Sequence, residues 1–203
     1  QYNLEKKQIL LSVGRLIPRK GLAEFLKFSF PTITKECPNV VFLIIGSEAQ
    51  NALKKDGQVL RDIKMIIQEN HLTNHVLLLG RVDDATLETA YQEADLFIFP
   101  LREVKGDVEG FGMVAVEAAA YSLPTVAFAV GGVTDAVAHE KSGFLVAPNE
   151  YDEFTKVIIN YLKNNTTGVT PAACQHHAKQ FSWDNFGEKL REICKRATTS
   201  NVG

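Results

Sequence analysis

The sequence has few cysteines. Cys37, Cys174 and Cys194 are the only three among 203 residues, and no two of them form a CxxC pair. An odd number of widely spaced cysteines argues against a disulfide framework and against a structural zinc site. We therefore expect three reduced thiols in a cytoplasmic protein.

Long apolar runs are also lacking. The longest, such as VVFLII at residues 40–45, are far too short to cross a bilayer. The chain starts QYNLEKKQ, with neither an initiator methionine nor the apolar core of a secretory signal. This start indicates a piece excised from a longer polypeptide.

A basic surface stripe is a third absence. The formal net charge is −2, and the lysines and arginines are spread along the chain without interleaved aromatic residues. This distribution argues against nucleic acid as the main partner. The hydrophobic content of 45% suits a soluble globular protein. At this length the chain is large enough for a single core, and we expect one domain over residues 1–203.

Short apolar segments alternate with helical patterns along most of the chain. Most of the apolar segments lack the alternation of a half-exposed strand, which is typical of parallel strands covered on both faces. The predicted strands are 8–13, 40–46, 75–80, 94–100, 124–130 and 143–147. The repeated alternation predicts an α/β fold with a Rossmann-like, doubly wound parallel sheet of about six strands.

The predicted helices lie between and after these strands. They cover residues 21–35, 51–70, 84–93, 112–121, 151–163, 171–180 and 182–197. Pro31 should kink or end the first of them. In the last one, Ser182 is a candidate N-cap, and Trp183, Phe186 and Leu190 begin one apolar face that Ile193 completes.

Ligands of such sheets bind beyond the carboxyl ends of the strands, and the segment GRLIPRKG at 14–21 follows the first strand. Arg15 lies just after that strand, and Lys20 lies just before the next predicted helix. Together with the helix dipole, these two cations could hold a phosphate group. The alternative is a pair of solvated surface cations. A P-loop is excluded because the GxxxxGK order is absent.

A second candidate site is VEGFGMVAVE, which places Glu109 and Glu117 eight positions apart. The GxGxxA match at 110–115 is rejected as a dinucleotide fingerprint, because a long loop precedes it and no acidic residue ends the next strand. Eight helical residues rise about 12 Å, which exceeds the carboxylate separations of glycosidases.

Two contacts to one extended ligand fit this spacing better than a catalytic pair does. A helix that starts near Gly112 would offer free N–H groups to an anion or a sugar oxygen. The alternative is that Glu109 complements the helix dipole while Glu117 is half-exposed. The residues alone leave both interpretations open.

Taken in order, these motifs resemble the donor-binding half of the retaining GT-B glycosyltransferases of group 1, or family 4. The resemblance rests on GRL…RKG, on GRV after the third strand, and on LREVKGDVEGFGMVAVEAAAYSLPTVAFAVGGVTDAV, SGFLV and FSWDNF. It extends from about Gln8 to Arg196. Its most specific element is the E-x7-E pattern with GFG inside it. The DVEGFG form is similar to mannosyltransferases that use GDP-mannose.

The resemblance implies a role for each matching residue. Arg15 and Lys20, which follow Gly14, would hold the nucleotide diphosphate and stabilise it as the leaving group. Glu109 would contact the donor sugar and, with Arg15 and Lys20, form the catalytic set, whereas Glu117 would bind the ribose hydroxyls. The backbone would contribute at the remaining donor-binding positions. The turn formed by Gly110, Phe111, Gly112 and Met113 would face the sugar and phosphate, and the backbone of Val82 would contact the base.

The resemblance also implies an activity, the transfer of a hexosyl group from a nucleotide sugar, GDP-mannose or a UDP-sugar, to an unknown acceptor. No metal and no cofactor are expected. The acceptor, whether glycan, lipid or small molecule, and any peripheral membrane contact would involve a missing N-terminal domain, toward which helix 182–197 would pack. The fragment alone should be inactive. An epimerase-like GT-B enzyme and a non-catalytic nucleotide-sugar sensor are the alternatives.

Overall fold

A parallel β-sheet forms the centre of the molecule. The structure is a computed structural model that describes residues 4–48, 58–164 and 168–199. Within these residues the strands are β1 (Gln8–Val13), β2 (Val40–Ile45), β3 (Val76–Gly80), β4 (Leu96–Phe99), β5 (Thr125–Phe128) and β6 (Gly143–Val146). They pair in parallel in the order β3-β2-β1-β4-β5-β6. The predicted six-stranded, doubly wound α/β sheet is confirmed.

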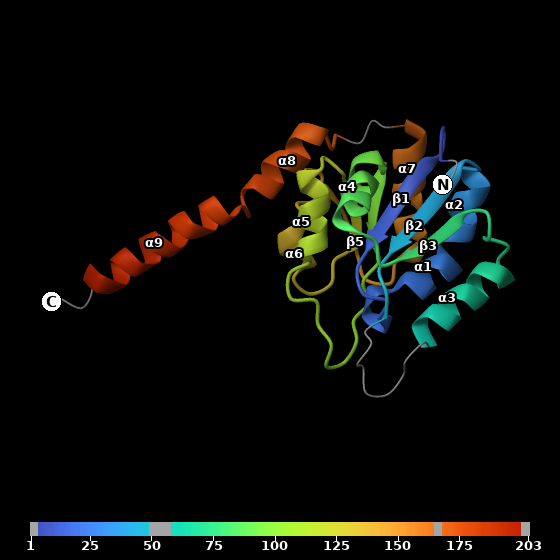
Figure 1. Ribbon diagram of the computed structural model, residues 1–203, viewed down its shortest axis with the longest axis horizontal. Coiled ribbons are helices and arrows are strands. Elements are labelled where there is room, and N and C mark those ends of the chain that lie inside the picture. The colour runs from blue at the N-terminus through green and yellow to red at the C-terminus, as the bar shows by residue number, and fades with distance from the viewer. Residues whose placement is uncertain (1–3, 49–57, 165–167, 200–203) are drawn as a thin grey trace.

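Helices cover both faces of this sheet, with α1, α2 and α3 on one side and α4, α5 and α6 on the other (Figure 1). The bounds in the first half are η1 (Pro18–Lys20, a short 3-10 turn), α1 (Leu22–Phe28), α2 (Phe30–Glu36), α3 (Gln58–Glu69) and α4 (Asp84–Glu93). They continue with α5 (Met113–Ala120), α6 (Val133–Ala136), α7 (Tyr151–Asn164), α8 (Pro171–Lys179) and α9 (Trp183–Thr199). Helix α7 packs beside α1 and α2, and α8 packs on α5.

The core lies between the sheet and these helices. Every residue of β2 is buried, which explains why VVFLII shows no alternation. Phe25, Phe30, Phe42 and Phe154 are fully buried and contact one another edge-on or at a tilt across the α1–α2–α7 face. Burial of each such side chain contributes about 1.5–3 kcal/mol.

The predicted helix over 21–35 is two helices, and the break explains the position of Pro31. Ser29 is both the C-cap of α1 and the N-cap of α2, and Pro31 lies in the first turn of α2, where the missing N–H of proline costs no hydrogen bond. The buried Ser29 hydroxyl donates to the carbonyl of Tyr151 at 3.3 Å, so the break is anchored to α7. The first residues of the predicted helix 51–70, namely 51–57, lie outside the described residues.

Helix α9 extends away from the body of the molecule (Figure 1). The predicted cap is confirmed, because the Ser182 hydroxyl accepts a hydrogen bond from the backbone N–H of Asn185 at 3.3 Å. Trp183 is 84% exposed and Ile193 63% exposed, so the apolar face of α9 has no cover within the described chain. Packing of this helix against another domain stays a prediction. Among the described helices, none has the length and hydropathy to cross a bilayer.

The ends of β1 and β2 approach each other closely, and glycine makes this possible. Gly46 has a φ of 139°, and a Cβ added there would lie 1.8 Å from the carbonyl oxygen of Gly14. The backbone N–H of Gly14 donates to the carbonyl of Ile45 at 2.9 Å. Any side chain at Gly46 would therefore push the two strand exits apart.

We predict that Gly46→Ala lowers the free energy of unfolding by more than about 2 kcal/mol, because strain and steric overlap add. Gly80→Ala is the matched control. Gly80 also has a positive φ, 66°, but an added Cβ would meet nothing within 4 Å. The Gly80→Ala substitution should lower the free energy of unfolding only by the backbone strain, about 1 kcal/mol. Urea denaturation measures both, and equal losses would contradict the steric argument.

Candidate functional site

Two loops meet where the strand order of the sheet reverses, between β1 and β4. They are the β1–α1 turn (residues 14–21) and the β4–α5 loop (residues 100–112), and both follow carboxyl ends of strands (Figure 1). The N–H of Arg102 donates to the carbonyl of Arg19 at 2.9 Å. Gly21 has a φ of 65°, and a Cβ there would lie 1.8 Å from the carbonyl oxygen of Pro100. The loops are therefore in direct backbone contact at the switch point, where ligands of such sheets bind.

Four charged side chains join these loops. Arg19 Nε donates to Asp107 Oδ1 at 2.8 Å, and Arg19 Nη1 donates to Glu109 Oε2. Lys20 Nζ donates to the same Glu109 oxygen at 2.8 Å. The Arg19 side chain is 6% exposed, Lys20 13% and Glu109 15%. We call these four residues the ionic cluster. It contains equal numbers of positive and negative charges, as burial of charge requires.

The pKa values within the cluster follow from burial and pairing. Burial opposes ionisation of Glu109, but hydrogen bonds and charge from Lys20 and Arg19 outweigh it, so the pKa of this carboxyl lies below its usual value. For Lys20 burial dominates: its pKa is lowered despite the ion pair with Glu109, and the positive charges of Arg19 and Arg15 add to the shift. Lys20 Nζ also lies 4.6 Å from the centroid of the Phe99 ring. The site thus holds an ionised carboxylate beside a desolvated ammonium group.

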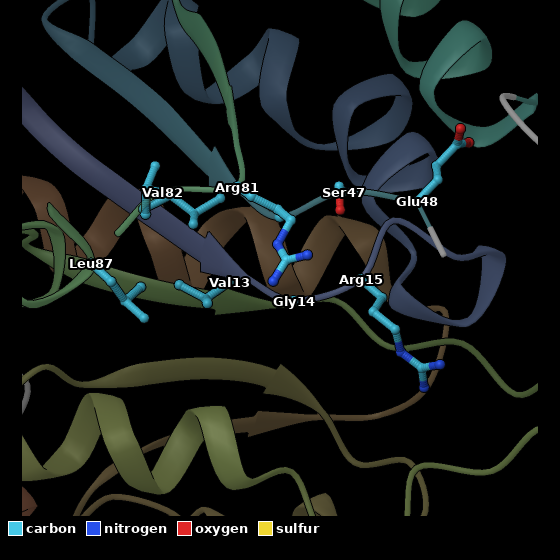
Figure 2. Close-up of a pocket in the computed structure, with 10 residues that line it drawn as sticks. Val13, Gly14, Arg15, Ser47, Glu48, Arg81, Val82 and Leu87 are labelled. Atoms are coloured by element: carbon cyan, nitrogen blue, oxygen red, sulfur yellow. The ribbon is translucent and has the colours of Figure 1, made fainter. Parts of the chain in front are cut away.

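A pocket of about 460 Å³ opens beside the cluster at the ends of β1, β2 and β3. It is lined by Val13, Gly14, Arg15, Ile45, Gly46, Ser47, Glu48, Arg81, Val82 and Leu87. Three predicted donor-binding residues, Gly14, Arg15 and Val82, are therefore brought together. Figure 2 shows the Arg81 side chain reaching between Val82 and Arg15.

Gly14 connects the pocket to the cluster. A Cβ added to Gly14 would lie 3.4 Å from Cε of Lys20, so the lysine side chain passes directly beside the pocket wall. The side chains of Lys20 and Glu109 themselves do not line this pocket. The predicted cation pair is thus split: Arg15 is exposed in the pocket, and Lys20 is half-buried in the ionic cluster.

The predicted turn at 110–113 lies at the start of α5. Gly112, with a φ of 89°, precedes the helix in the left-handed conformation. The preceding backbone is held by the β5–α6 glycines: the N–H of Gly132 donates to the carbonyl of Glu109 at 3.1 Å, and a Cβ on Gly132 would lie 2.0 Å from the carbonyl oxygen of Gly110.

The two apolar side chains of this turn differ in exposure. Phe111 is half-buried, with its ring centroid 5.1 Å from that of Phe181, whereas Met113 is 56% exposed. The turn is therefore fixed on one side by aromatic packing and open on the other.

Glu117 lies apart from the ionic cluster. It is exposed on α5, and its Oε2 accepts a hydrogen bond from the hydroxyl of Tyr91 on α4 at 3.1 Å. Burial and the charge of Glu117 raise the pKa of Tyr91, so the phenol remains a donor. Tyr91 in turn stacks on Tyr121, with ring centroids 5.4 Å apart. Across the described chain, no hydrogen bond or ion pair joins Glu117 to the cluster.

Sequence reasoning missed Arg19, Asp107 and Arg81. A local signal existed for the first two. Arg19 is adjacent to Lys20, and Asp107 is two residues before Glu109, which places the two carboxylates on the same side of an extended segment. Nothing in the sequence indicates that Arg19 is buried. No cluster of three His, Cys, Asp or Glu side chains suited to a metal ion occurs within residues 4–48, 58–164 and 168–199.

Comparison with known families identifies the chain. The model for the family "Glycosyl transferases group 1" matches residues 1–194. Because the match spans nearly the whole chain, the protein belongs to this family, and the identification made from its motifs is confirmed.

Among curated proteins, the chain is 26% identical over 200 residues to a GDP-mannose-dependent α-(1-6)-phosphatidylinositol monomannoside mannosyltransferase of Mycobacterium tuberculosis, covering 96% of this chain and 49% of the relative. It is 30% identical over 191 residues to a D-inositol 3-phosphate glycosyltransferase of Mycolicibacterium smegmatis, covering 94% of this chain and 41% of the relative. The chain thus spans about half the length of the curated relatives it matches.

Solved structures share the fold. Anabaena HepE in complex with UDP matches with a TM-score of 0.77 at 25% identity, covering 95% of this chain and 50% of that one. The C-terminal domain of a glycosyl transferase group 1 family protein, LpcC, from Francisella tularensis matches with a TM-score of 0.69 at 17% identity, covering 86% of this chain and 85% of that one. The latter shows the fold alone. The Rossmann-like α/β unit of GT-B enzymes is confirmed.

The pKa of Glu109 leads to a prediction about stability and pH. Because its folded-state pKa lies below the unfolded value, near 4.3, ionised Glu109 stabilises the fold at higher pH, and this contribution is lost as the pH falls through the folded pKa. Glu109→Gln should therefore be less stable than the parent at pH 7, and the difference should shrink as the pH falls below the unfolded-state pKa of about 4.3. Urea denaturation between pH 3 and 7 measures this.

Glu103→Gln is the control, since Glu103 lies exposed in the same loop. It should follow the parent profile throughout. A gap between Glu109→Gln and the parent that stays constant down to pH 3 would contradict the assigned pKa shift.

Proposed function

We propose that this chain is the donor-binding domain of a retaining glycosyltransferase that moves a hexosyl group from a nucleotide sugar to an acceptor. One observation carries the proposal: the Lys20–Glu109 ion pair lies at the switch point of the sheet, beside a pocket lined by Gly14, Arg15 and Val82. The family to which the chain belongs supports it.

The chemistry needed at such a site is stabilisation of a leaving nucleoside diphosphate, on which negative charge develops. Arg15 is exposed toward the pocket, and Lys20 lies beside it in a partly desolvated position, where a positive charge acts strongly on a phosphate group. These two side chains supply the positive charge for the diphosphate. No metal is assigned to this step.

The remaining residues bind the rest of the donor. Glu109, kept ionised by its partners, can accept hydrogen bonds from sugar hydroxyls, and we assign it no nucleophilic role. Glu117 is held by Tyr91 and is exposed, as a carboxylate that binds ribose hydroxyls must be. The base would lie in the pocket against the backbone of Val82, and the turn at 110–113 would face the sugar and phosphate.

The donor class is a GDP- or UDP-sugar. GDP-mannose is favoured by the DVEGFG segment and by the similarity to the GDP-mannose-dependent mannosyltransferase of Mycobacterium tuberculosis. A UDP-sugar is supported by the UDP complex of HepE. Binding affinity for the two nucleotides distinguishes these possibilities directly.

Acceptor binding is assigned to a part of the protein beyond this chain, which spans only about half of its curated relatives. The apolar face of α9 is a candidate surface for contact with that part. The acceptor would be a glycan, a lipid or a small molecule, and the buried thiols of Cys37 and Cys174 suit a cytoplasmic location.

Isothermal titration calorimetry with GDP, UDP and ADP tests donor binding. Arg15→Met should weaken the binding of the preferred nucleotide roughly tenfold, as expected for the loss of one charged hydrogen bond. Glu117→Gln should weaken it less, because one neutral acceptor remains. Arg191→Met, on α9 and remote from the pocket, is the control. If no nucleotide binds, or if the three variants behave alike, the proposed function is wrong.

We expect the 203-residue chain to bind a nucleotide sugar without transferring the sugar by itself. The reason is that a bound donor would face no acceptor site. The measurement is release of free nucleotide from GDP-mannose and from UDP-glucose, with and without simple sugar acceptors. Transfer of sugar by this chain to any added acceptor would refute the expectation.

A further inference from the structure

Arg19 is the most buried member of the ionic cluster, and the family motifs give it no role. Only 6% of its side chain is exposed, and its guanidinium contacts two carboxylates of the β4–α5 loop. Burial of an arginine is costly unless its charge is paired and its N–H groups are satisfied. Arg19 is therefore not an ordinary solvated surface arginine.

Glu109 shares one oxygen between two cations. Oε2 accepts from both Arg19 Nη1 and Lys20 Nζ. If a diphosphate binds beside Gly14, it competes for the ammonium group of Lys20. Glu109 would then remain half-buried with Arg19 as its single positively charged partner in the cluster. Without Arg19, the carboxylate would have to retain Lys20 or become protonated.

We propose that Arg19 is a positioning residue for donor binding. Its guanidinium keeps the Glu109 carboxylate ionised and aimed at the donor sugar, and so allows Lys20 to turn from Glu109 to the diphosphate. The inference rests on the proposed function, and it assigns to this site a residue that touches neither sugar nor phosphate.

The geometry requires arginine rather than lysine. Nε contacts Asp107 at 2.8 Å while Nη1 contacts Glu109, so the planar fork fixes the two carboxylates relative to each other. A lysine at this position would retain the charge but has one compact donor group, which cannot reproduce this geometry. Burial opposes the charge of Arg19, but the hydrogen bonds that it donates to Glu109 and Asp107 outweigh burial and raise its pKa, so the arginine keeps its proton in the folded protein.

A second ion pair in the same loop supplies the control. Arg102 pairs with Glu24 and so ties the β4–α5 loop to α1, but it does not contact Glu109. If Arg19 only held the loop in place, removal of Arg102 would have a similar effect on donor binding. If Arg19 positions Glu109, the two variants must differ.

The test is calorimetric titration of the 203-residue chain with GDP and GDP-mannose, and with UDP and UDP-glucose. The readout is the ratio of the nucleotide Kd to the nucleotide-sugar Kd, which isolates the contribution of the sugar. Arg19→Met should lower this ratio roughly tenfold, as expected for the loss of a hydrogen bond to a charged group. Arg19→Lys should lower it about threefold, and Arg102→Met should leave it unchanged.

Thermal unfolding of each variant accompanies the titrations, because Arg19→Met removes the ion-pair partner of Asp107 and one of the two cations that pair with Glu109. If that variant does not fold, the ratio of Kd values is compared between Arg19→Lys and Arg102→Met instead. The inference alone is overturned if the parent binds nucleotides but the ratio is the same in parent, Arg19 and Arg102 variants, or if sugar adds nothing to binding by the parent. If the parent binds no nucleotide, the proposed function falls first.

Discussion

The buried guanidinium of Arg19 joins the two halves of the sheet at the point where their strand order reverses. The β1–α1 turn and the β4–α5 loop belong to strands that are neighbours in space but are separated by about ninety residues of chain. A parallel sheet brings such exits to one edge, and the doubly wound order opens a crevice between them. What keeps this crevice polar and ordered is a set of matched charges, since a lone charge at this depth would be far too costly.

A cluster of paired charges that were all equally buried would be only a structural contact. The ionic cluster is suited to chemistry because its members differ in solvent exposure. Arg19 is almost fully enclosed, while Lys20 and Glu109 retain some exposure and lie beside the pocket. Burial lowers the pKa of Lys20, whereas its cationic partners lower the pKa of Glu109 despite burial. A polyanionic ligand beside Gly14 would meet an ammonium group that has little water to lose.

Backbone contact sets the positions of these side chains as much as charge does. Gly14 against Gly46, and Gly110 against Gly132, bring main chain to main chain at distances that no side chain would permit. The glycines at the strand exits therefore serve packing between loops, in addition to any approach of a ligand. This is why a glycine-rich strand exit by itself says little about function.

The strands were predictable to within about two residues, because β2 and β4 are continuous apolar runs that only a sheet covered on both faces would bury. The break of the first helix was only partly predictable. Pro31 indicated a disturbance, but the chain breaks at Ser29, where a buried hydroxyl bonds α7. That partner lies more than a hundred residues away and leaves no local signal.

The sequence by itself determined the fold class, the family and four charged candidates, Arg15, Lys20, Glu109 and Glu117, since these depend on local pattern and motif. Only the tertiary structure decided how they are grouped. It joined Lys20 to Glu109, placed Arg15 in the pocket and Glu117 beside Tyr91, and buried Arg19 among carboxylates. The reason is physical. The charge of an arginine and its local sequence are the same whether water or two carboxylates surround the side chain, because burial is a property of the folded chain.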